Sequence, residues 1–189
     1  MTRVAEFPIE SMLLSRWSPR AMNGQPVSEE TLHRLFEAAH WAPSAGNSQP
    51  WRYSYASRSD PEFATLFDLL VEGNQIWCKQ AGALIVALSQ TVLDNGRPHP
   101  THAFDAGAAW MSLALQGSAL GLVVHGMAGF DAARARTVLE LPDSLAVHAM
   151  IAVGHPGRLE DLPEKLQERE KPSPRRPVRE LIWKGRFPR

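Results

Sequence analysis

The chain has 189 residues, 44% of them hydrophobic, with 20 basic side chains against 20 acidic ones. This length and composition predict one globular domain that spans residues 1–189 and buries a substantial core. Proteins that bind nucleic acid or an anionic membrane have a concentrated basic face, and this balanced charge gives no sign of one. We therefore expect a small-molecule partner.

The cysteine content and the apolar runs indicate where in the cell the protein is expected and whether it spans a membrane. The single cysteine, Cys78, has no internal partner for a disulfide, and no charged segment followed by an apolar one opens the chain, which favours the cytoplasm. The longest apolar stretch, residues 106–124, has the length of a membrane span. Because it carries Ser112, Gln116 and Ser118, we expect a buried helix instead.

Two helices are predicted before the first strand. The first is short and covers about residues 9–16. For the second, Val27 and Ser28 provide a hydrophobic staple and an N-cap, and Pro43 stops the chain. Its apolar positions recur at helical spacing at Leu32, Leu35, Phe36 and Ala39.

Three segments have strand patterns. Residues 51–56 alternate and are rich in aromatics, as in a half-buried strand, whereas residues 81–88 form a continuous apolar run suited to a central strand. Residues 145–153 form a third. Further helices are predicted at residues 61–70, 105–120, 132–141 (capped by Asp131) and 162–170, and an extended tail follows. The class is α+β, with about four or five strands.

The sequence PSAGNSQPW, from Pro43 to Trp51, lies between a helix and a strand and predicts a binding loop. Its small residues let a ligand approach the backbone, and its two amides offer polar contacts. A turn with local side-chain hydrogen bonds is the alternative, and Trp51 is better explained as a core residue.

Cations recur in two further motifs. In RWSPR, Arg16 and Arg20 lie four residues apart with Ser18 between them, so a turn could direct two cations and a hydroxyl at one phosphate. A solvated helix end is the alternative. Arg175 and Arg176 precede Pro177 and are either part of the same site or an ordinary basic linker.

These motifs, in this order and with HGMAGFD at residues 125–131, resemble the FMN-dependent nitroreductase family over about residues 15–187. The resemblance implies a nitroreductase-like α+β fold with a mostly antiparallel central sheet flanked by helices. It also implies an intertwined homodimer with the flavin at the interface, in which a C-terminal tail, about residues 171–189, wraps the partner subunit. Leu181, Ile182 and Trp183 are apolar residues in that tail that call for burial.

The resemblance also assigns roles to residues. Arg16, Ser18, Arg20, Arg175 and Arg176 would hold the FMN phosphate and ribityl chain, with only a backbone or stacking contact from Trp17. The loop would contact the ribityl and pyrimidine groups, and the backbone N–H near Ala128 would donate to flavin N5. The remaining residues expected at the flavin are Pro43, Ser44, Ala45, Asn47, Asn74, Trp77, Gly126, Met127 and Gly129.

Packing alone could account for two of these segments. Trp77 stands where relatives often have a basic residue, so it fits core packing better than flavin contact, and the cation that stabilises reduced flavin is left open, with Lys79 nearby. Residues 125–131 also suit a strand-to-helix turn, which is compatible with flavin binding. No protein side chain is required as a catalytic acid.

Other chemistries have little support. His99 and His102 form an HxxH pair without a carboxylate or cysteine at metal spacing, so no metal site is expected. Cys78 lies among apolar residues and is expected to be buried. The sequence has no GxGxxG, Walker or GxSxG motif, which argues against Rossmann, NTPase and hydrolase functions.

The function predicted from the sequence is an FMN-dependent oxidoreductase that takes hydride from NADH or NADPH and reduces an electron-poor acceptor, such as a nitroaromatic or a quinone, by a ping-pong cycle. One alternative is a reductase for a specific enone or halogenated metabolite, or a supplier of reduced flavin. Another is a non-catalytic flavin-binding or sensing protein, which would not oxidise NAD(P)H.

Overall fold

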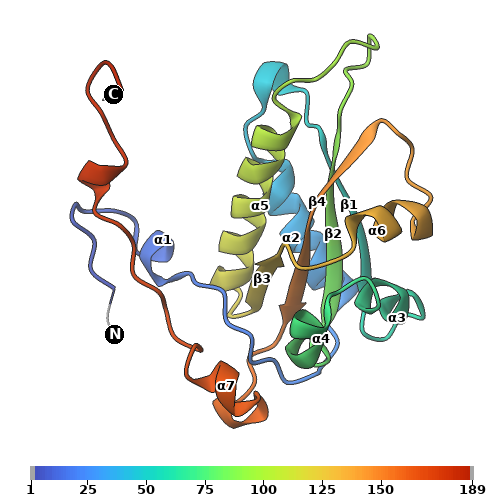
Figure 1. The fold of residues 1–189 in the computed structure, drawn as a ribbon, viewed down its shortest axis with the longest axis vertical. Helices are drawn as coiled ribbons and strands as arrows, with labels where there is room; N and C mark the ends of the chain where they lie inside the picture. Colours follow the sequence, from blue (N-terminus) through green and yellow to red (C-terminus); the bar gives the residue numbers. More distant parts are fainter. Residues whose placement is uncertain (1–2, 188–189) are drawn as a thin grey trace.

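A four-stranded antiparallel sheet forms the centre of the computed structural model, which describes residues 3–187 (Figure 1). The strand order is β1-β2-β4-β3, and every neighbouring pair is antiparallel. The strands are β1 (Trp51–Ser57), β2 (Ala83–Gln90), β3 (Val123–Met127) and β4 (Leu145–Gly154). The predicted α+β class with an antiparallel sheet is therefore confirmed.

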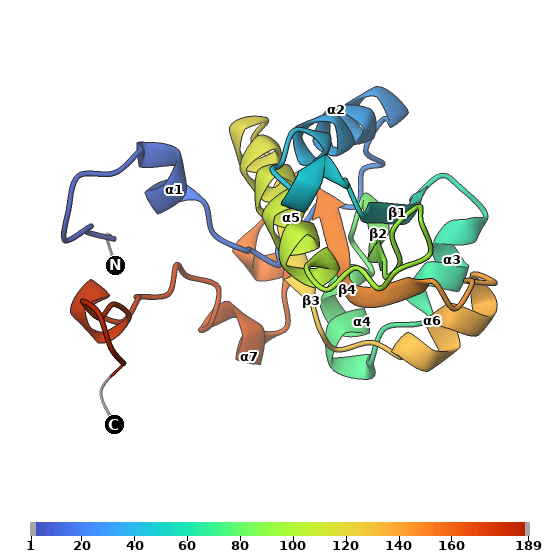
Figure 2. The same ribbon diagram turned by 90° about the horizontal axis from the view of Figure 1, so that it is seen from above.

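Helices cover both faces of the sheet (Figure 2). The central strand β2 is buried on both sides because its residues alternate between two cores: Ile85 packs with the helices of one face, and Leu84 and Val86 with those of the other. The first face carries α2 (Glu29–His40) and α5 (His102–Ala119); the second carries α3 (Glu62–Phe67), α4 (Glu72–Cys78) and α6 (Ala132–Val138).

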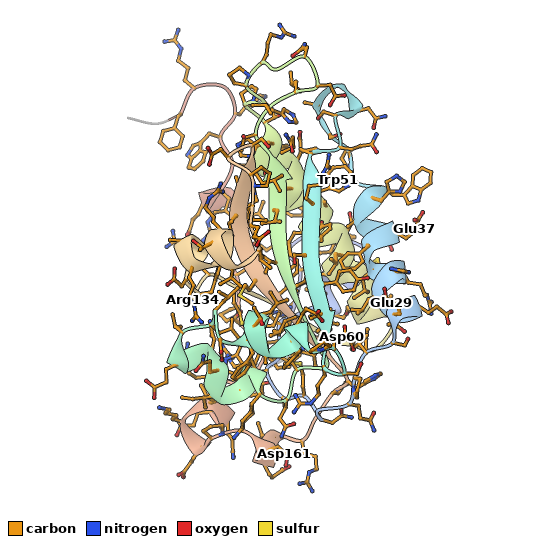
Figure 3. The ribbon with its side chains drawn as sticks, turned by 90° about the vertical axis from the view of Figure 1, so that its right-hand side faces the viewer. Glu29, Glu37, Trp51, Asp60, Arg134 and Asp161 are labelled. Carbon is orange, nitrogen blue, oxygen red and sulfur yellow. The ribbon has the colours of Figure 1, made fainter. Side chains whose placement is uncertain are left out.

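The amphipathic pattern of α2 explains its position. The Ser28 side chain accepts a hydrogen bond from the Thr31 N–H, which confirms the predicted N-cap. Leu32 and Leu35 are fully buried against the sheet and α5. On the opposite side of the helix, Glu29 and Glu37 point away from the sheet (Figure 3). Trp51 is buried in the same core, as predicted.

The long apolar stretch of the sequence forms two elements. Helix α5 ends at Ala119, and Gly121, with φ of +72°, reverses the chain into β3. Within the described residues no helix is both long and apolar enough to cross a bilayer.

The register of β4 leaves its first half without a neighbouring strand on the β3 side. Strand β3 pairs with residues 150–154 of β4, so the first half of β4 extends beyond the end of β3 (Figure 1). In the β2–β4 ladder, Ala87 pairs with Ala149 and Leu88 with Val147, which leaves His148 as the extra residue of a β-bulge.

The two terminal segments lie together beside the main body (Figures 1 and 2). The Arg3 guanidinium donates hydrogen bonds to the carbonyls of Leu14, Arg16 and Ser173, which connects the N-terminal segment to the tail. Helices here are shorter than predicted: α1 covers Ser11–Ser15 and α7 only Glu164–Gln167. The tail contains a 3-10 turn, Val178–Glu180, followed by exposed Leu181, Ile182 and Trp183.

Candidate functional site

Three adjoining cavities follow β3 and share lining residues, and together we call them the groove. The first, which we call the apolar cavity, has a volume of about 480 Å³ and lies between α5 and β4. The cationic pocket, about 390 Å³, shares Arg16 and Ser18 with it. The amide pocket, about 410 Å³, shares residues 126–128 with the apolar cavity and Arg20 and His125 with the cationic pocket.

The cationic pocket is built for an anion. It is lined by the cationic side chains of Arg3, Arg16, Arg20, Arg169, Lys171 and Arg175. Within the described residues, the only ion pair these cations form joins Arg20 to Glu170. Desolvation, together with the charges of Arg3 and Arg175, lowers the pKa of Arg16. Its buried Nε has no hydrogen-bond partner in the described part of the chain. An anion would relieve this repulsion and satisfy that donor.

The backbone of residues 16–20 is fixed by contacts from distant parts of the chain. Glu170 Oε1 accepts hydrogen bonds from the backbone N–H groups of Arg20 (2.5 Å) and Ala21 (2.9 Å). His125 Nδ1 lies 2.8 Å from the Pro19 carbonyl, which can only accept, so this nitrogen carries the proton. Desolvation lowers the pKa of His125, so the ring is neutral near pH 7. The turn is therefore held rigidly.

The amide pocket contains both residues predicted on α4. The Asn74 side-chain amide donates to the Gly129 carbonyl at 2.9 Å. Trp77 is 3% exposed and its ring lies 4.7 Å from that of His125, so the preference for core packing is confirmed although its edge lines the pocket. Lys79 does not line this pocket; Arg20 and Arg169 do.

Two glycines of the HGMAGFD motif lie where an added Cβ would come very close to neighbouring side chains. A Cβ on Gly126 would lie 2.9 Å from Cζ2 of Trp110, and one on Gly129 would lie 2.7 Å from Nδ2 of Asn74. The Asp131 side chain caps α6 by accepting from the Arg134 N–H, as predicted. The motif is thus a strand-to-helix turn whose residues 126–129 also line the groove.

The predicted binding loop lies apart from this groove. Pro43, Ser44, Ala45 and Asn47 line none of the three cavities of the groove. The loop is attached to the N-terminal end of α5 instead, where the Ala45 N–H donates to the buried Asp105 carboxylate at 3.3 Å. One protomer therefore does not bring the loop and the groove together.

The backbone of the loop is strained, which suggests a functional role. Gly46 has φ of +59°, but the non-glycine residues Asn47 and Gln49 are also left-handed, with φ of +55° and +47°. The Ser44 Oγ accepts a hydrogen bond from the Gln49 N–H at 3.0 Å and holds this conformation. The local side-chain hydrogen bonding expected of a turn is therefore present together with the strain.

The tail divides the predicted arginine pair. Arg175 lines the cationic pocket, whereas Arg176 does not; Arg176 lines a neighbouring cavity between the two terminal segments, which Arg3 and Arg175 also line. Arg3, Arg169 and Lys171 of the same pocket were not predicted. The run EREK at residues 168–171, directly before the predicted basic cluster, was the available signal for two of them.

Other reactive groups are accounted for structurally. Burial raises the pKa of the Cys78 thiol, and its sulfur lies 3.4 Å from that of Met127 in the core. His99 is buried with Asp105, at 3.6 Å, and also contacts Ser48. In the described residues no group of three or more His, Cys, Asp or Glu side chains is arranged to hold a metal ion.

Comparison with known proteins identifies the family. The sequence model of the Nitroreductase family matches residues 13–75 and 57–155. The chain belongs to the nitroreductase family. A crystal structure of an oxidoreductase containing FMN is 43% identical, with a TM-score of 0.95 over 98% of this chain and 96% of that one. The motif-based assignment to the nitroreductase family is thus confirmed.

Two further comparisons cover most of the chain. A crystal structure of a protein from Desulfovibrio desulfuricans in complex with FMN is 28% identical, with a TM-score of 0.72 over 97% of this chain and all of that one. A protein of Thermus thermophilus named NADH dehydrogenase is 28% identical in an alignment that covers 90% of this chain and 93% of its own length.

Proposed function

We propose that this protein is an FMN-dependent oxidoreductase that takes hydride from NADH or NADPH and reduces an electron-poor acceptor such as a quinone or a nitroaromatic. The observation that carries the proposal is the cationic pocket, in which the buried Arg16 Nε has no partner among the described residues and, of the six cations, only Arg20 forms an ion pair there. FMN in the similar crystal structures and the NADH dehydrogenase name of a relative support the choice of cofactor and reductant.

The residues present fit FMN. Its phosphate matches the cationic pocket, where Arg16, Arg20 and Arg175 would hold it, while Ser18 supplies a hydroxyl beside Arg16, at 3.2 Å from the guanidinium. The polar edge of the ring matches the amide pocket, which offers Asn74 and the exposed residues Gly126 and Ala128. When bound, the flavin supplies the two-electron chemistry of the reaction.

Trp77 stands where relatives often have a basic residue that stabilises reduced flavin. We propose that Arg20 and Arg169 take over the role of that cation. Both line the amide pocket as well as the cationic pocket. Negative charge that develops on the pyrimidine edge of the cofactor would be stabilised by these guanidinium groups. Arg20 is held in place by its ion pair with Glu170 at 3.5 Å, whereas Arg169 lines the pocket from the segment just before the tail.

We further propose that two copies of the chain form each site. The loop at residues 43–47 is conformationally strained and lies away from its own groove, so a second protomer would supply it. Large exposed apolar side chains on the terminal segments, including Phe7, Leu181, Ile182, Trp183 and Phe187, support an interface there. In this arrangement the tail at residues 171–189 wraps the partner.

The test begins with the absorbance spectrum of the purified protein and of protein supplied with FMN. We expect a bound flavin that is bleached anaerobically by NADH or NADPH and re-oxidised by 1,4-naphthoquinone. A protein that takes up no FMN contradicts the cofactor assignment. One that binds FMN but is reduced by neither nicotinamide is a binding or sensing protein and not this enzyme.

A further inference from the structure

The β-bulge in β4 places His148 on the α5 side of the sheet. Val147 and Met150 both pack into the core on the opposite side, with His148 and Ala149 between them. In a regular strand His148 would share a side with Met150, because side chains alternate with a period of two. The extra residue shifts this alternation, and His148 and Ala149 both line the apolar cavity.

His148 belongs to a chain of hydrogen bonds that leads out of the cavity. Its Nε2 lies 2.6 Å from Oγ of Ser89, and the same oxygen lies 2.7 Å from Nδ1 of His102, the first residue of α5. Ser89 is fully buried, which excludes it as a nucleophile toward a ligand, whereas His102 is only partly buried. Buried Ser89 therefore connects the cavity to a solvent-accessible ring.

The chemistry of a hydroxyl makes this chain directional. The Ser89 hydroxyl has one proton, so it donates to one histidine and accepts from the other. When it donates to Nε2 of His148, the proton of that ring is on Nδ1, for which no hydrogen bond is found among the described residues. If Nδ1 gives up its proton, the hydroxyl proton moves to Nε2 of His148, and the Nδ1 proton of His102 moves to the hydroxyl as solvent protonates Nε2 of His102. One proton thus reaches the cavity, and His102 recovers one from solvent.

The rest of the apolar cavity suits a flat ring. Ala103, Ala106 and Gly107 of α5 leave the space open, and Trp110 and Met127 supply apolar surface. A Cβ added to Gly107 would meet nothing within 4 Å, so packing does not require this glycine. The polar side chains of the cavity are Arg16 and Ser18, next to the cationic pocket, and His148.

We propose that the apolar cavity binds a quinone-type acceptor and that Nδ1 of His148 donates the proton its carbonyl oxygen needs. The inference rests on the proposed function, which supplies the hydride. A quinone that gains one hydride becomes a hydroquinone monoanion. The Nδ1 proton of His148 forms the second O–H bond, and the relay through Ser89 and His102 delivers a replacement proton to Nε2 of His148. Two electrons and two protons are thereby added, and every ring of the relay ends neutral.

The surroundings of His148 favour this neutral relay. Desolvation, followed by the charge of His102, lowers the pKa of His148, so the ring is neutral near pH 7. The other titratable or charged groups nearby are His99 and Asp105, beyond His102, and Arg16 across the cavity. A neutral donor resupplied through hydrogen bonds needs no persistent imidazolium in the apolar cavity.

The kinetic test isolates the step that re-oxidises the protein. The holoprotein is reduced with dithionite, so the result does not depend on NAD(P)H, and is mixed with 1,4-naphthoquinone in a stopped-flow instrument. We expect His148→Gln to slow re-oxidation by about 100-fold, since a positioned acid contributes at least that factor. Ser89→Ala should slow it as well. His33→Gln, which changes an exposed histidine of α2, is the matched control and should match the parent.

The solvent isotope effect and NMR provide independent readouts. The parent should show a solvent deuterium isotope effect on re-oxidation that His148→Gln removes. Imidazole ¹⁵N spectra of the protein without added cofactor should show the His148 nitrogens shifting when 1,4-naphthoquinone is added, and a changed His148 tautomer in Ser89→Ala. Unchanged re-oxidation in a folded His148→Gln protein, or His148 signals that do not respond to the quinone, would overturn the inference.

Discussion

The side chain of Glu170 holds the backbone of Arg20 from 150 residues farther along the sequence, at 2.5 Å from its N–H. The same carboxylate accepts from the N–H of Ala21 and forms an ion pair with the Arg20 guanidinium. One buried carboxylate thus fixes the turn, directs one of the proposed phosphate-binding arginines and positions the start of the tail, where Arg169 and Lys171 also line the cationic pocket.

Replacing Glu170 should therefore affect both stability and cofactor affinity. We expect Glu170→Ala to lower the free energy of unfolding by about 1–3 kcal/mol, because hydrogen bonds from two backbone donors to a charged acceptor are lost. FMN binding should weaken as well. Urea unfolding and a fluorescence titration with FMN measure the two effects. Glu168→Ala, an exposed neighbour, is the control and should change neither; a stable, tightly binding Glu170→Ala protein contradicts the role.

The proposed phosphate contacts can be removed without touching the core. Each charge-assisted contact stabilises binding by about 1.5–3 kcal/mol, so Arg16→Ala combined with Arg175→Ala should raise the Kd for FMN by about 100-fold or more. Circular dichroism should show a folded protein. Arg176→Ala is the matched control because Arg176 lies outside the cationic pocket. If the double variant stays as yellow as the parent at micromolar concentration, these residues do not hold the phosphate.

Mixed dimers test whether the loop acts on the partner's groove. One variant carries Ser44→Ala and Asn47→Ala, and the other carries Arg16→Ala and Arg175→Ala. Neither homodimer should retain FMN well. A mixed dimer, isolated with two affinity tags, has one intact groove facing one intact loop, so we expect one tightly bound FMN per dimer. Mixed dimers with no recovered binding would show that the loop does not complete the partner's site, and a monomer in sedimentation would exclude the arrangement.

Tyr53 provides a test of the core under alkaline conditions. Its hydroxyl is buried with no hydrogen-bond partner in the described residues, and burial raises the pKa of Tyr53 to about 12. Between about pH 10 and the folded pKa, the unfolded chain ionises and the folded one does not, so stability is full below pH 10 and falls by about 2–3 kcal/mol as pH rises through this range.

Tyr53→Phe should therefore remove most of that alkaline loss, and it should raise stability near pH 8 by about 1 kcal/mol because an unpaired buried hydroxyl disappears. Urea unfolding of parent and variant at pH 8 and pH 11 measures both effects. Tyr55→Phe is the comparison: the hydrogen bond from the Tyr55 hydroxyl to Glu29 also raises the pKa of Tyr55, but this group lies at the surface, so the variant should remove a smaller part of the alkaline loss than Tyr53→Phe. An equal alkaline loss in the parent and in Tyr53→Phe would show that Tyr53 is not the group responsible.

Local patterns were sufficient to predict most secondary structure. The cap at Ser28, the stop at Pro43 and the continuous apolar run of β2 each depend on residues close together in the sequence, and each is found. The helix expected at residues 162–170 is reduced to α7 because Pro163 precedes its first turn and the chain then extends into the proline-containing tail. In the candidate site, residues from the segments 16–20, 74–77 and 126–129 line neighbouring pockets, and their contacts with a flavin stay a prediction.

The sequence by itself determined the family, the α+β class and the presence of two basic motifs, because these follow from residue types at short and fixed spacings. Only the tertiary structure decided that Arg3 and Arg169 join Arg16, that Arg176 does not, and that the loop at residues 43–47 lies away from the groove. It also placed His148 beside the apolar cavity through a bulge relative to β2. The physical reason is that strand register and the path of the tail depend on contacts between residues far apart in the chain, which no local pattern encodes.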